Sequence, residues 1–452
     1  MIFTKDKQFY KTLVALSIPI ALQNFITFCV TLADNVMIGT LGDAAVSGVY
    51  LGSQVQTLLQ IFCAGIDGAV LILSAQYWGK KDTASISRIV SIGIRASLIF
   101  AALVSAVCMI APRMVMSLFT NETDTIGTGA EYLSILAISF IFFCLTQSLI
   151  TAMRSVETAR LGLWVSLASL GVNVALNYVL IFGKLGFEPM GVRGAAIATL
   201  LSRITEFAIT AVYVLFIDKK LKFPLKELLY TDRALLKDFL RYGMPIIAGQ
   251  IVWAVNTMSN SAIMGRQNIE GVVTGLSIAN TLNTLAYVTM NGMSAAVGVI
   301  TGKTIGAGKE KLMREYARTV QALFLMLGLV TGGTLFLIRK PFISLYAVSA
   351  AAKAQALSMI NVLSVTAIGT CYQAACLFGL VKSGGDTSFV FKNDTIFVFL
   401  VVIPSAILAT YLGAPPWVVF ACLKCDQILK CFVAAVKINR FNWMKNLTRE
   451  AN

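Results

Sequence analysis

Apolar stretches long enough to cross a bilayer recur from one end of this 452-residue chain to the other. About 20 consecutive apolar residues span the hydrocarbon core as a helix. Apolar residues make up 57% of the chain and charged residues only 13%, against about 45–50% and about 25% in an ordinary soluble domain. Because lipid offers the backbone no hydrogen-bond partners, such spans must be helices or closed barrels. Their length favours helices, so the chain is predicted to be an all-α integral membrane protein.

Breaks in the apolar runs divide the chain into twelve predicted transmembrane helices. Lys and Arg gather in alternate loops, which places both termini in the cytoplasm by the positive-inside rule. The prediction is therefore a multi-pass protein of the cell inner (plasma) membrane with cytoplasmic termini. The twelve spans lie at approximately 13–35, 46–77, 88–111, 130–152, 161–182, 192–216, 241–264, 274–301, 316–338, 355–381, 389–412 and 416–436.

The longest hydrophilic stretch, residues 218–240, separates two sets of six spans. It is rich in lysine and is predicted to be a cytoplasmic linker that lies on the lipid surface. The chain then divides into an N-terminal lobe at 1–217, this linker, a C-terminal lobe at 241–436 and a cytoplasmic tail at 437–452.

The two halves are also related in sequence. Pro19 matches Pro245, and Gly39 matches Gly265, at one and the same offset. Each half contains six spans, an even number, so both halves enter the membrane from the same side. They are expected to be related by a pseudo-two-fold axis along the membrane normal, with a substrate cavity between the lobes and alternating access to it.

Several classes of chemistry are excluded by composition. The chain contains no histidine, which removes Ser-His triads, histidine-bound zinc and histidine-bound haem. Residues 298–304 (GVITGKT) have three residues between the glycines, where an ATP-binding loop needs four. The net charge of +15 indicates topology rather than nucleic-acid binding. The chain is predicted to be no enzyme, to need no cofactor or ATPase subunit, and to draw on an H⁺ or Na⁺ gradient.

Asp34 is the most informative ionisable residue because it lies deep in the first predicted span. A charged group at such a position costs about 2.5–3.5 kcal/mol on insertion scales. Its counterpart in the second half is the uncharged Asn260. An isolated buried carboxylate must be neutralised by a proton, a bound cation or a cationic ligand. Asp34 is therefore predicted to couple transport to H⁺ or Na⁺, with a structural, hydrogen-bonded aspartate as the alternative.

Oxygen-bearing side chains in later spans can complete a cation site. Asn173 and Asn177, spaced i,i+4, share one helix face, and Thr199 in the following span adds a hydroxyl. Such oxygens suit a small cation such as Na⁺, although asparagines also join membrane helices by hydrogen bonds. Asp67 is a secondary proton-site candidate that could equally bond a neighbouring helix. No other metal site is predicted.

Two further groups of charges lie within spans. Arg203 and Glu206, at i,i+3, are predicted to form a structural ion pair rather than a substrate site. Lys424, Asp426 and Lys430 lie in the last span, where Asp426 and Lys430 form an i,i+4 pair. No function is assigned to this second group from the sequence.

The spans at 241–264 and 274–301 are unusually rich in polar, aromatic and methionine side chains. Aromatic faces attract organic cations and methionine adapts to varied shapes. These spans either line a substrate cavity or pack as ordinary helices. The substrate-cavity candidates are Gln250, Trp253, Asn256, Met258, Asn260, Asn283, Tyr287 and Met290.

Three motifs resemble those of the multidrug and toxic compound extrusion (MATE) family. They are residues 177–183 (NYVLIFG) followed by 191–199 (GVRGAAIAT), residues 33–39 (ADNVMIG) and residues 76–80 (QYWGK). The resemblance covers nearly the whole chain and implies a cation-coupled exporter of small organic, often cationic, compounds. The family's N-lobe cation site would fall on Asp34, Asn173, Asn177 and Thr199. The expected partners of the chain are small organic compounds and the lipid bilayer, and a monomer is expected.

The chain departs from one branch of that family. Trp253 and Cys371 stand where the NorM-like branch carries acidic residues, so the resemblance favours the DinF-like branch. A flippase for a lipid-linked substrate is the alternative within the same superfamily. A membrane prenyltransferase would need clustered carboxylates to hold Mg²⁺, and no span has an aspartate-rich motif.

Overall fold

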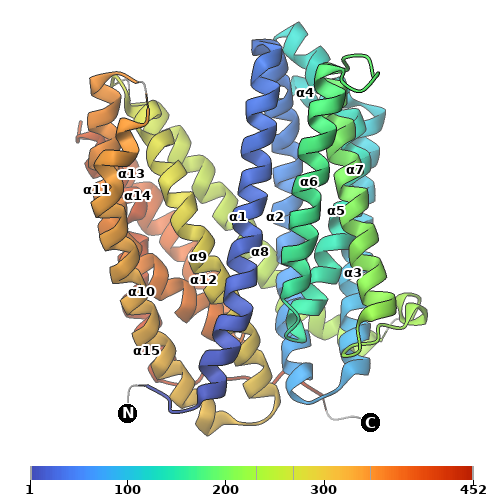
Figure 1. Ribbon diagram of the computed structural model, residues 1–452. Helices are drawn as coiled ribbons and strands as arrows, with labels where there is room; N and C mark the ends of the chain where they lie inside the picture. The colour runs from blue at the N-terminus through green and yellow to red at the C-terminus, as the bar shows by residue number, and fades with distance from the viewer. Residues whose placement is uncertain (1–2, 231, 268, 347, 450–452) are drawn as a thin grey trace. The chain divides into compact units, whose positions relative to one another are not determined.

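The computed structural model describes residues 3–230, 232–267, 269–346 and 348–449 (Figure 1). Within these ranges every regular element is a helix and there is no β-strand. The chain folds into two compact units. The N-unit is Leu22–Gly243, and the C-unit is Met1–Ala21 together with Met244–Asn452. The predicted all-α, two-lobed fold is confirmed.

The N-unit holds the second part of the first helix and the helices that follow it. In chain order the elements are α1 Lys7–Ile38, η1 Gly39–Leu41, α2 Asp43–Gly79, α3 Thr83–Ile110, α4 Pro112–Ser117, α5 Thr123–Ser155, α6 Arg160–Phe182, α7 Gly191–Val212, the π-helical η2 Tyr213–Ile217 and η3 Leu225–Leu228.

The C-unit contains most of α8 and all later elements. Two of its segments, η4 and η5, are π-helical. At Cys425 the last predicted span is divided into the two helices α14 and α15. The elements are α8 Arg233–Gly265, α9 Val272–Gly306, α10 Glu310–Ser344, α11 Ala350–Gln373, the π-helical η4 Ala374–Lys382, α12 Thr387–Ile396, the π-helical η5 Phe397–Val402, α13 Ile403–Tyr411, α14 Pro416–Lys424 and α15 Asp426–Asn439.

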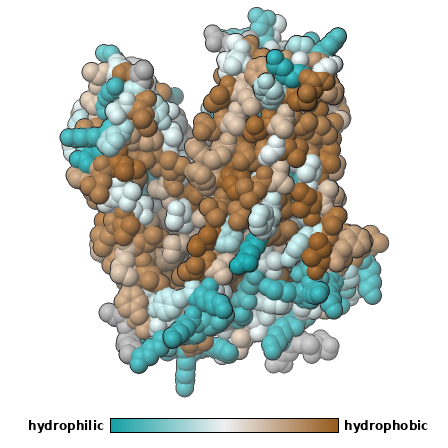
Figure 2. Space-filling model, in the orientation of Figure 1, coloured by the Kyte–Doolittle hydropathy of each residue, from teal (hydrophilic) through white to brown (hydrophobic). Residues whose placement is uncertain are grey.

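Ten helical segments of the described chain are long and apolar enough to cross a membrane. They coincide with ten of the twelve predicted spans. The other two predicted spans are helical as well: α8 carries many amides and hydroxyls, and α14 is separated from α15 at Cys425. Hydrophobic side chains cover most of the face seen in Figure 2, and hydrophilic side chains gather toward its ends. This distribution is the one a bilayer-spanning protein needs.

The unit boundaries differ in one respect from the predicted lobes at 1–217 and 241–436. The start of the chain packs with the C-unit, where the Thr4 backbone N–H donates to Thr319 Oγ1 at 2.8 Å. The predicted linker and the start of α8 belong to the N-unit. Helices α1 and α8 are therefore each divided between units, and Pro19 and Pro245 lie within three residues of the two divisions.

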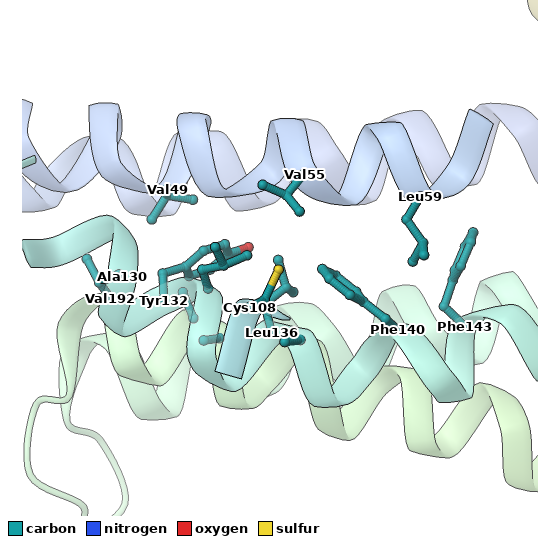
Figure 3. Close-up of a cluster of buried hydrophobic side chains, with 14 of the residues drawn as sticks. Val49, Val55, Leu59, Cys108, Ala130, Tyr132, Leu136, Phe140, Phe143 and Val192 are labelled. Carbon is teal, nitrogen blue, oxygen red and sulfur yellow. The ribbon is translucent and has the colours of Figure 1, made fainter. Parts of the chain in front are cut away.

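Helix α5 is central in the N-unit, where it packs on α2, α3 and α7. Leu133, Leu136 and Phe140 of α5 are fully buried in one apolar cluster. Figure 3 shows Leu136 and Phe140 of this cluster. Gly48 of α2 meets Gly129 of α5 so closely that a Cβ at Gly48 would lie 2.8 Å from the Gly129 nitrogen. Small residues permit this approach of two membrane helices.

Helix α11 has the corresponding place in the C-unit and packs on α9, α10, α14 and α15. Gly328 and Gly332, one turn apart on α10, lie against the backbone of α11. A Cβ at Gly332 would meet the Ser364 carbonyl oxygen at 2.3 Å, whereas one at Gly333 would meet nothing within 4 Å. The pair is thus a Gly-x-x-x-Gly packing surface of the kind that joins membrane helices.

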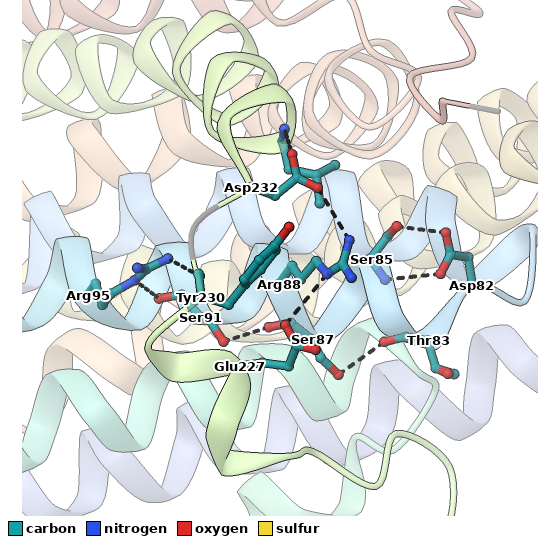
Figure 4. A network of polar contacts seen from close by, with 11 residues as sticks. Asp82, Thr83, Ser85, Ser87, Arg88, Ser91, Arg95, Glu227, Tyr230 and Asp232 are labelled. Carbon is teal, nitrogen blue, oxygen red and sulfur yellow. Dashed lines mark hydrogen bonds and ion pairs between the residues drawn. The ribbon is translucent and has the colours of Figure 1, made fainter. Parts of the chain in front are cut away.

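The segment between α7 and α8 is held against the N-unit by polar contacts (Figure 4). Arg88 of α3 forms ion pairs with Glu227 at 3.5 Å and Asp232 at 3.4 Å. Arg95 donates to the Tyr230 carbonyl oxygen at 3.0 Å. These contacts tie the predicted linker to the hydrophilic end of α3.

Candidate functional site

Asp34 lies opposite the asparagine pair of α6. Asn177 Nδ2 donates to Asp34 Oδ1 at 2.5 Å and to Asn173 Oδ1 at 3.2 Å. Both asparagines are only 1% exposed, and their i,i+4 spacing places them one above the other on α6. The structure therefore brings together three of the four residues of the predicted cation site.

Thr199, the fourth residue, is buried on α7, and its hydroxyl donates to the Ala195 carbonyl oxygen at 3.0 Å. The Thr199 side chain also lies close to Tyr132 of α5, and Tyr132 is near enough to Asp34 to interact with the Asp34 charge. Tyr132 is buried beside Val49 and Leu136 in Figure 3. Sequence reasoning missed Tyr132, because a tyrosine within an apolar run carries no spacing signal.

The oxygen atoms of this site indicate which ligand it can bind. Asn177 Oδ1 is buried and has no hydrogen-bond partner, which is a costly state for an amide oxygen. Together with the Asp34 carboxylate and Asn173 Oδ1 it offers hard oxygen ligands. Among the described residues no three His, Cys, Asp or Glu side chains come together to hold a metal. One carboxylate surrounded by amide and hydroxyl groups suits a proton or a small monovalent cation.

Arg203 and Glu206 form the predicted ion pair on α7. Arg203 Nη1 lies 3.0 Å from Glu206 Oε1 and 2.8 Å from Oε2, with both side chains largely buried. The Arg203 guanidinium also stacks over the Phe143 ring at 5.1 Å. Its charge acts on Asp34, so this pair borders the candidate site although sequence spacing gave no sign of it.

Asp67 belongs to a different polar cluster of the N-unit. It accepts a hydrogen bond from Ser148 Oγ at 3.2 Å and interacts with the charge of Arg154. Arg154 Nη2 in turn donates to Gln23 Oε1 at 2.6 Å. Asp67 and Asp34 therefore each interact with the charge of an arginine, Arg154 and Arg203 respectively, while their direct hydrogen bonds come from neutral side chains.

The substrate-cavity candidates of α8 differ in exposure. Trp253 and Met258 are exposed, and Gln250 is half-buried. Asn256 and Asn260 are half-buried one turn apart, and the Oδ1 atom of each lacks a hydrogen-bond partner. Both oxygen atoms are buried, so they are unsatisfied hydrogen-bond acceptors on one face of α8.

The candidates of α9 are more enclosed. Met290 is buried and packs with Tyr287, Cys371 and Ala374 in one small cluster. Asn283 is half-buried. Met290 therefore has a packing role, as the structural alternative for these spans expected.

Comparison with known proteins agrees with this architecture. The MatE family model matches residues 19–179 and 245–408, one match in each half. The probable multidrug resistance protein NorM of Thermotoga maritima is 25% identical over 338 residues, covering 74% of this chain and 72% of the relative. The probable multidrug resistance protein YoeA of Bacillus subtilis is 25% identical over 330 residues, covering 71% and 69%.

A solved structure shares the fold. The crystal structure of MATE in complex with MaL6 superposes with a TM-score of 0.86 at 19% identity, covering 97% of this chain and 99% of that one. The family match alone spans well over half of the sequence. The chain therefore belongs to the MatE family, the multidrug and toxic compound extrusion (MATE) transporters.

Proposed function

We propose that this protein is a secondary antiporter that exports small organic, often cationic, compounds in exchange for H⁺ or Na⁺, with Asp34 as the coupling carboxylate. The contact between Asp34 and Asn177 is the observation that carries this proposal. It puts the half-buried Asp34 carboxylate beside an amide whose own oxygen is unsatisfied. The names of the NorM and YoeA relatives, probable multidrug resistance proteins, support the substrate class.

Coupling follows from the change of charge at Asp34. The anionic carboxylate accepts the Asn177 hydrogen bond, whereas a protonated or cation-bound carboxylate interacts with α6 differently. A ligand that binds one conformation better shifts the population toward it, and the effect is reciprocal for the exported compound. Loading Asp34 from outside therefore favours release of the compound, and unloading it inside favours capture.

The C-unit is the proposed source of substrate contacts. The unpartnered Oδ1 atoms of Asn256 and Asn260 can accept hydrogen bonds, and the exposed Trp253 ring and Met258 offer a cation-attracting and adaptable surface. The remaining candidates, Gln250, Asn283 and Tyr287, would define the edge of such a surface.

We further propose the cellular setting that the sequence predicted. The protein would act as a monomer in the inner (plasma) membrane, with both termini in the cytoplasm. It would need no ATPase subunit, bind no nucleic acid and catalyse no covalent reaction. The residues at 253 and 371 favour the DinF-like branch.

The test is export of ethidium from proteoliposomes under a pH gradient alone and then a sodium gradient alone. One gradient should drive export in the wild type, and Asp34→Asn should abolish it while the protein stays folded and inserted. Asp124→Asn, an exposed acid at the start of α5, is the matched control and should export normally. Full activity of Asp34→Asn would reject the mechanism, and lipid scrambling without ethidium export would favour the flippase.

A further inference from the structure

Two cysteines of the N-unit face each other within the second and fourth predicted spans. The sulfur atom of Cys63 on α2 lies 2.8 Å from the sulfur atom of Cys144 on α5. Both side chains are buried, at 2% and 0% exposure, and both thiols are free. Because a disulfide bond is about 2.05 Å long, the two sulfur atoms need to approach by less than about 1 Å to be bonded.

The packing of α2 on α5 brings these two sulfur atoms together. Gly48 of α2 lies against Gly129 of α5, and farther along the same helices Ser148 Oγ donates to Asp67 Oδ1 at 3.2 Å. In both of these pairs, as in the cysteine pair, the residue numbers differ by 81. The two helices therefore run in parallel at one register over about five turns. The cysteines meet because of that register rather than through the rotamer of one side chain.

The C-unit differs at the corresponding contact. Helices α9 and α11 are the second and fourth spans of their repeat, as α2 and α5 are of theirs, and they also pack together. There Cys371 of α11 packs with Met290 of α9. A methionine thioether has no hydrogen to give up, so it cannot form a disulfide. Packing of the shared scaffold therefore does not require two thiols, and the pair is a property of the N-unit.

A carboxylate lies beside the two thiols. Asp67 follows Cys63 by one helical turn on α2 and is close enough to interact with the charge of the Cys63 sulfur. The thiolate is the form of cysteine that attacks an oxidant, so a thiol in apolar surroundings needs a nearby base to react. Asp67 can accept the proton that Cys63 gives up. Because both sulfurs are buried, the oxidant must be small and uncharged, and hydrogen peroxide is both.

We propose that Cys63 and Cys144 are an oxidation site, at which a peroxide joins α2 to α5 by a disulfide. The Cys63 sulfur attacks one oxygen of hydrogen peroxide, and the O–O bond breaks. A sulfenic acid forms, and the departing hydroxide takes the Cys63 proton from Asp67 and leaves as water. The Cys144 sulfur then attacks the sulfenic sulfur. The S–S bond forms, the S–O bond breaks, and the second hydroxide leaves as water with the Cys144 proton. The two thiols lose two electrons, which the peroxide gains.

The disulfide would act on the packing of the N-unit. Helix α5 packs on α2, α3 and α7, and a covalent bond to α2 would prevent these two helices from sliding along each other. The reaction requires neither an exported compound nor an ion gradient. Its test is therefore independent of the proposed antiport and of Asp34.

The test is made on the full chain, purified into lipid nanodiscs and treated with hydrogen peroxide. The remaining thiols are alkylated under denaturing conditions, and the digested peptides are identified by mass. We expect a linked pair of peptides that contains Cys63 and Cys144 and is lighter than the two reduced peptides by two hydrogen atoms. Dithiothreitol should restore the separate peptides. Two separately alkylated peptides after peroxide treatment, or a sulfenic acid without a link, would overturn the proposal.

Substitutions identify the atoms that react. Cys63→Ser and Cys144→Ser should each abolish the linked pair, whereas Cys108→Ser, in the same buried apolar cluster, should retain it. Asp67→Asn should slow formation of the link several-fold relative to Asp124→Asn, which alters an exposed acid of α5. Equal rates in these two variants would remove Asp67 from the reaction. The link in the wild type is measured without any substitution, so the test remains decisive if a variant fails to fold.

Discussion

The two units share a scaffold but differ in the partners of Asp34 and of the acids Asp394 on α12 and Asp426 on α15. In the N-unit, Asp34 on the first helix is bonded by an amide, and no lysine or arginine forms an ion pair with it in the described residues. In the C-unit the equivalent position is Asn260, and the acids lie on α12 and α15 with Lys430 bonded to both. A carboxylate with neutral partners responds to an arriving ion, whereas one that is already paired resists it. The repeat thus preserves helix packing while allowing each unit its own electrostatics.

The segments that follow the last span of each repeat make similar contacts with an earlier loop. After the π-helical η2, Lys220 Nζ donates to the Val156 carbonyl oxygen at 2.8 Å, in the loop between α5 and α6. After the last C-unit helix, the Lys445 backbone N–H donates to the Gly384 carbonyl oxygen at 2.8 Å, in the equivalent loop before α12. The predicted linker and the predicted tail are therefore corresponding segments of the two repeats.

The largest predicted effect concerns Lys430. Lys430→Met leaves two buried carboxylates facing each other, and breaking a buried ion pair costs about 3–5 kcal/mol. Arg203→Met leaves only Glu206 uncompensated and should destabilise less. Unfolding of the purified variants in mixed micelles measures both. Equal losses for the two variants would erase the contrast between the units.

The second-largest effect is expected from truncating Trp443, a buried side chain of the predicted tail. Trp443 is fully buried and its Nε1 donates to the Ile438 carbonyl oxygen at 3.0 Å. Trp443→Ala should lower stability by about 3–5 kcal/mol, measured by thermal unfolding. Trp164→Ala, which truncates a side chain that is 65% exposed on α6, is the control. A neutral Trp443→Ala would show that the tail is dispensable.

Amide substitutions test whether the two acidic sites differ in function. Asn177→Leu removes the hydrogen-bond donor to Asp34, and a bond to a charged group is worth about 1.5–3 kcal/mol. The initial rate of ethidium export should therefore fall about tenfold or more. Gln427→Leu, which removes a hydrogen-bond donor to Asp426, should have a smaller effect, because Asp426 retains Lys430. If Gln427→Leu had the larger effect, coupling would reside mainly in the C-unit.

Helix packing in the C-unit can be tested by two adjacent glycines. Gly332→Ala places a methyl group against the Ser364 carbonyl oxygen, and such overpacking costs about 1–3 kcal/mol. Gly333→Ala meets open space and should change stability by less than about 0.5 kcal/mol. Equal melting temperatures for the two variants would contradict the close contact of α10 with α11.

The smallest effect is a pH dependence at the hydrophilic end of the C-unit. Burial alone would raise the pKa of Asp386, but hydrogen bonds from Lys437 and Lys445 outweigh it and hold the pKa below the ordinary value of 3.8. A lowered folded-state pKa stabilises the fold above the unfolded-state value, and this contribution is lost as the pH falls through the folded-state value. Asp386→Asn should therefore melt below the wild type at neutral pH, and the difference should shrink below pH 3.8. A constant difference would contradict the assignment.

Local sequence rules predicted part of the site and no more. The i,i+4 and i,i+3 spacings identified Asn173 with Asn177 and Arg203 with Glu206, because neighbours on one helix face are fixed by helix geometry. The approach of Tyr132 to Thr199 and of Asp394 to Lys430 depends on which helices pack together. Spacing within a single helix does not contain that information.

The fold was predicted more fully than the site for a related reason. Bilayer thickness sets the length of each span, so twelve helices could be read from apolar runs alone. The π-helical segments η4 and η5, and the division of α1 between units, have no comparable signature.

The burial of Trp443 against Gly384 has a consequence for how the protein is made. A Cβ at Gly384 would meet the Trp443 ring at 2.3 Å, so the indole fills a place prepared much earlier in the chain. Domains assemble during synthesis from the N-terminus onward. The second lobe can therefore complete its packing at Gly384 only after Trp443 has been synthesised, and a chain that terminates before Trp443 would leave this place unfilled.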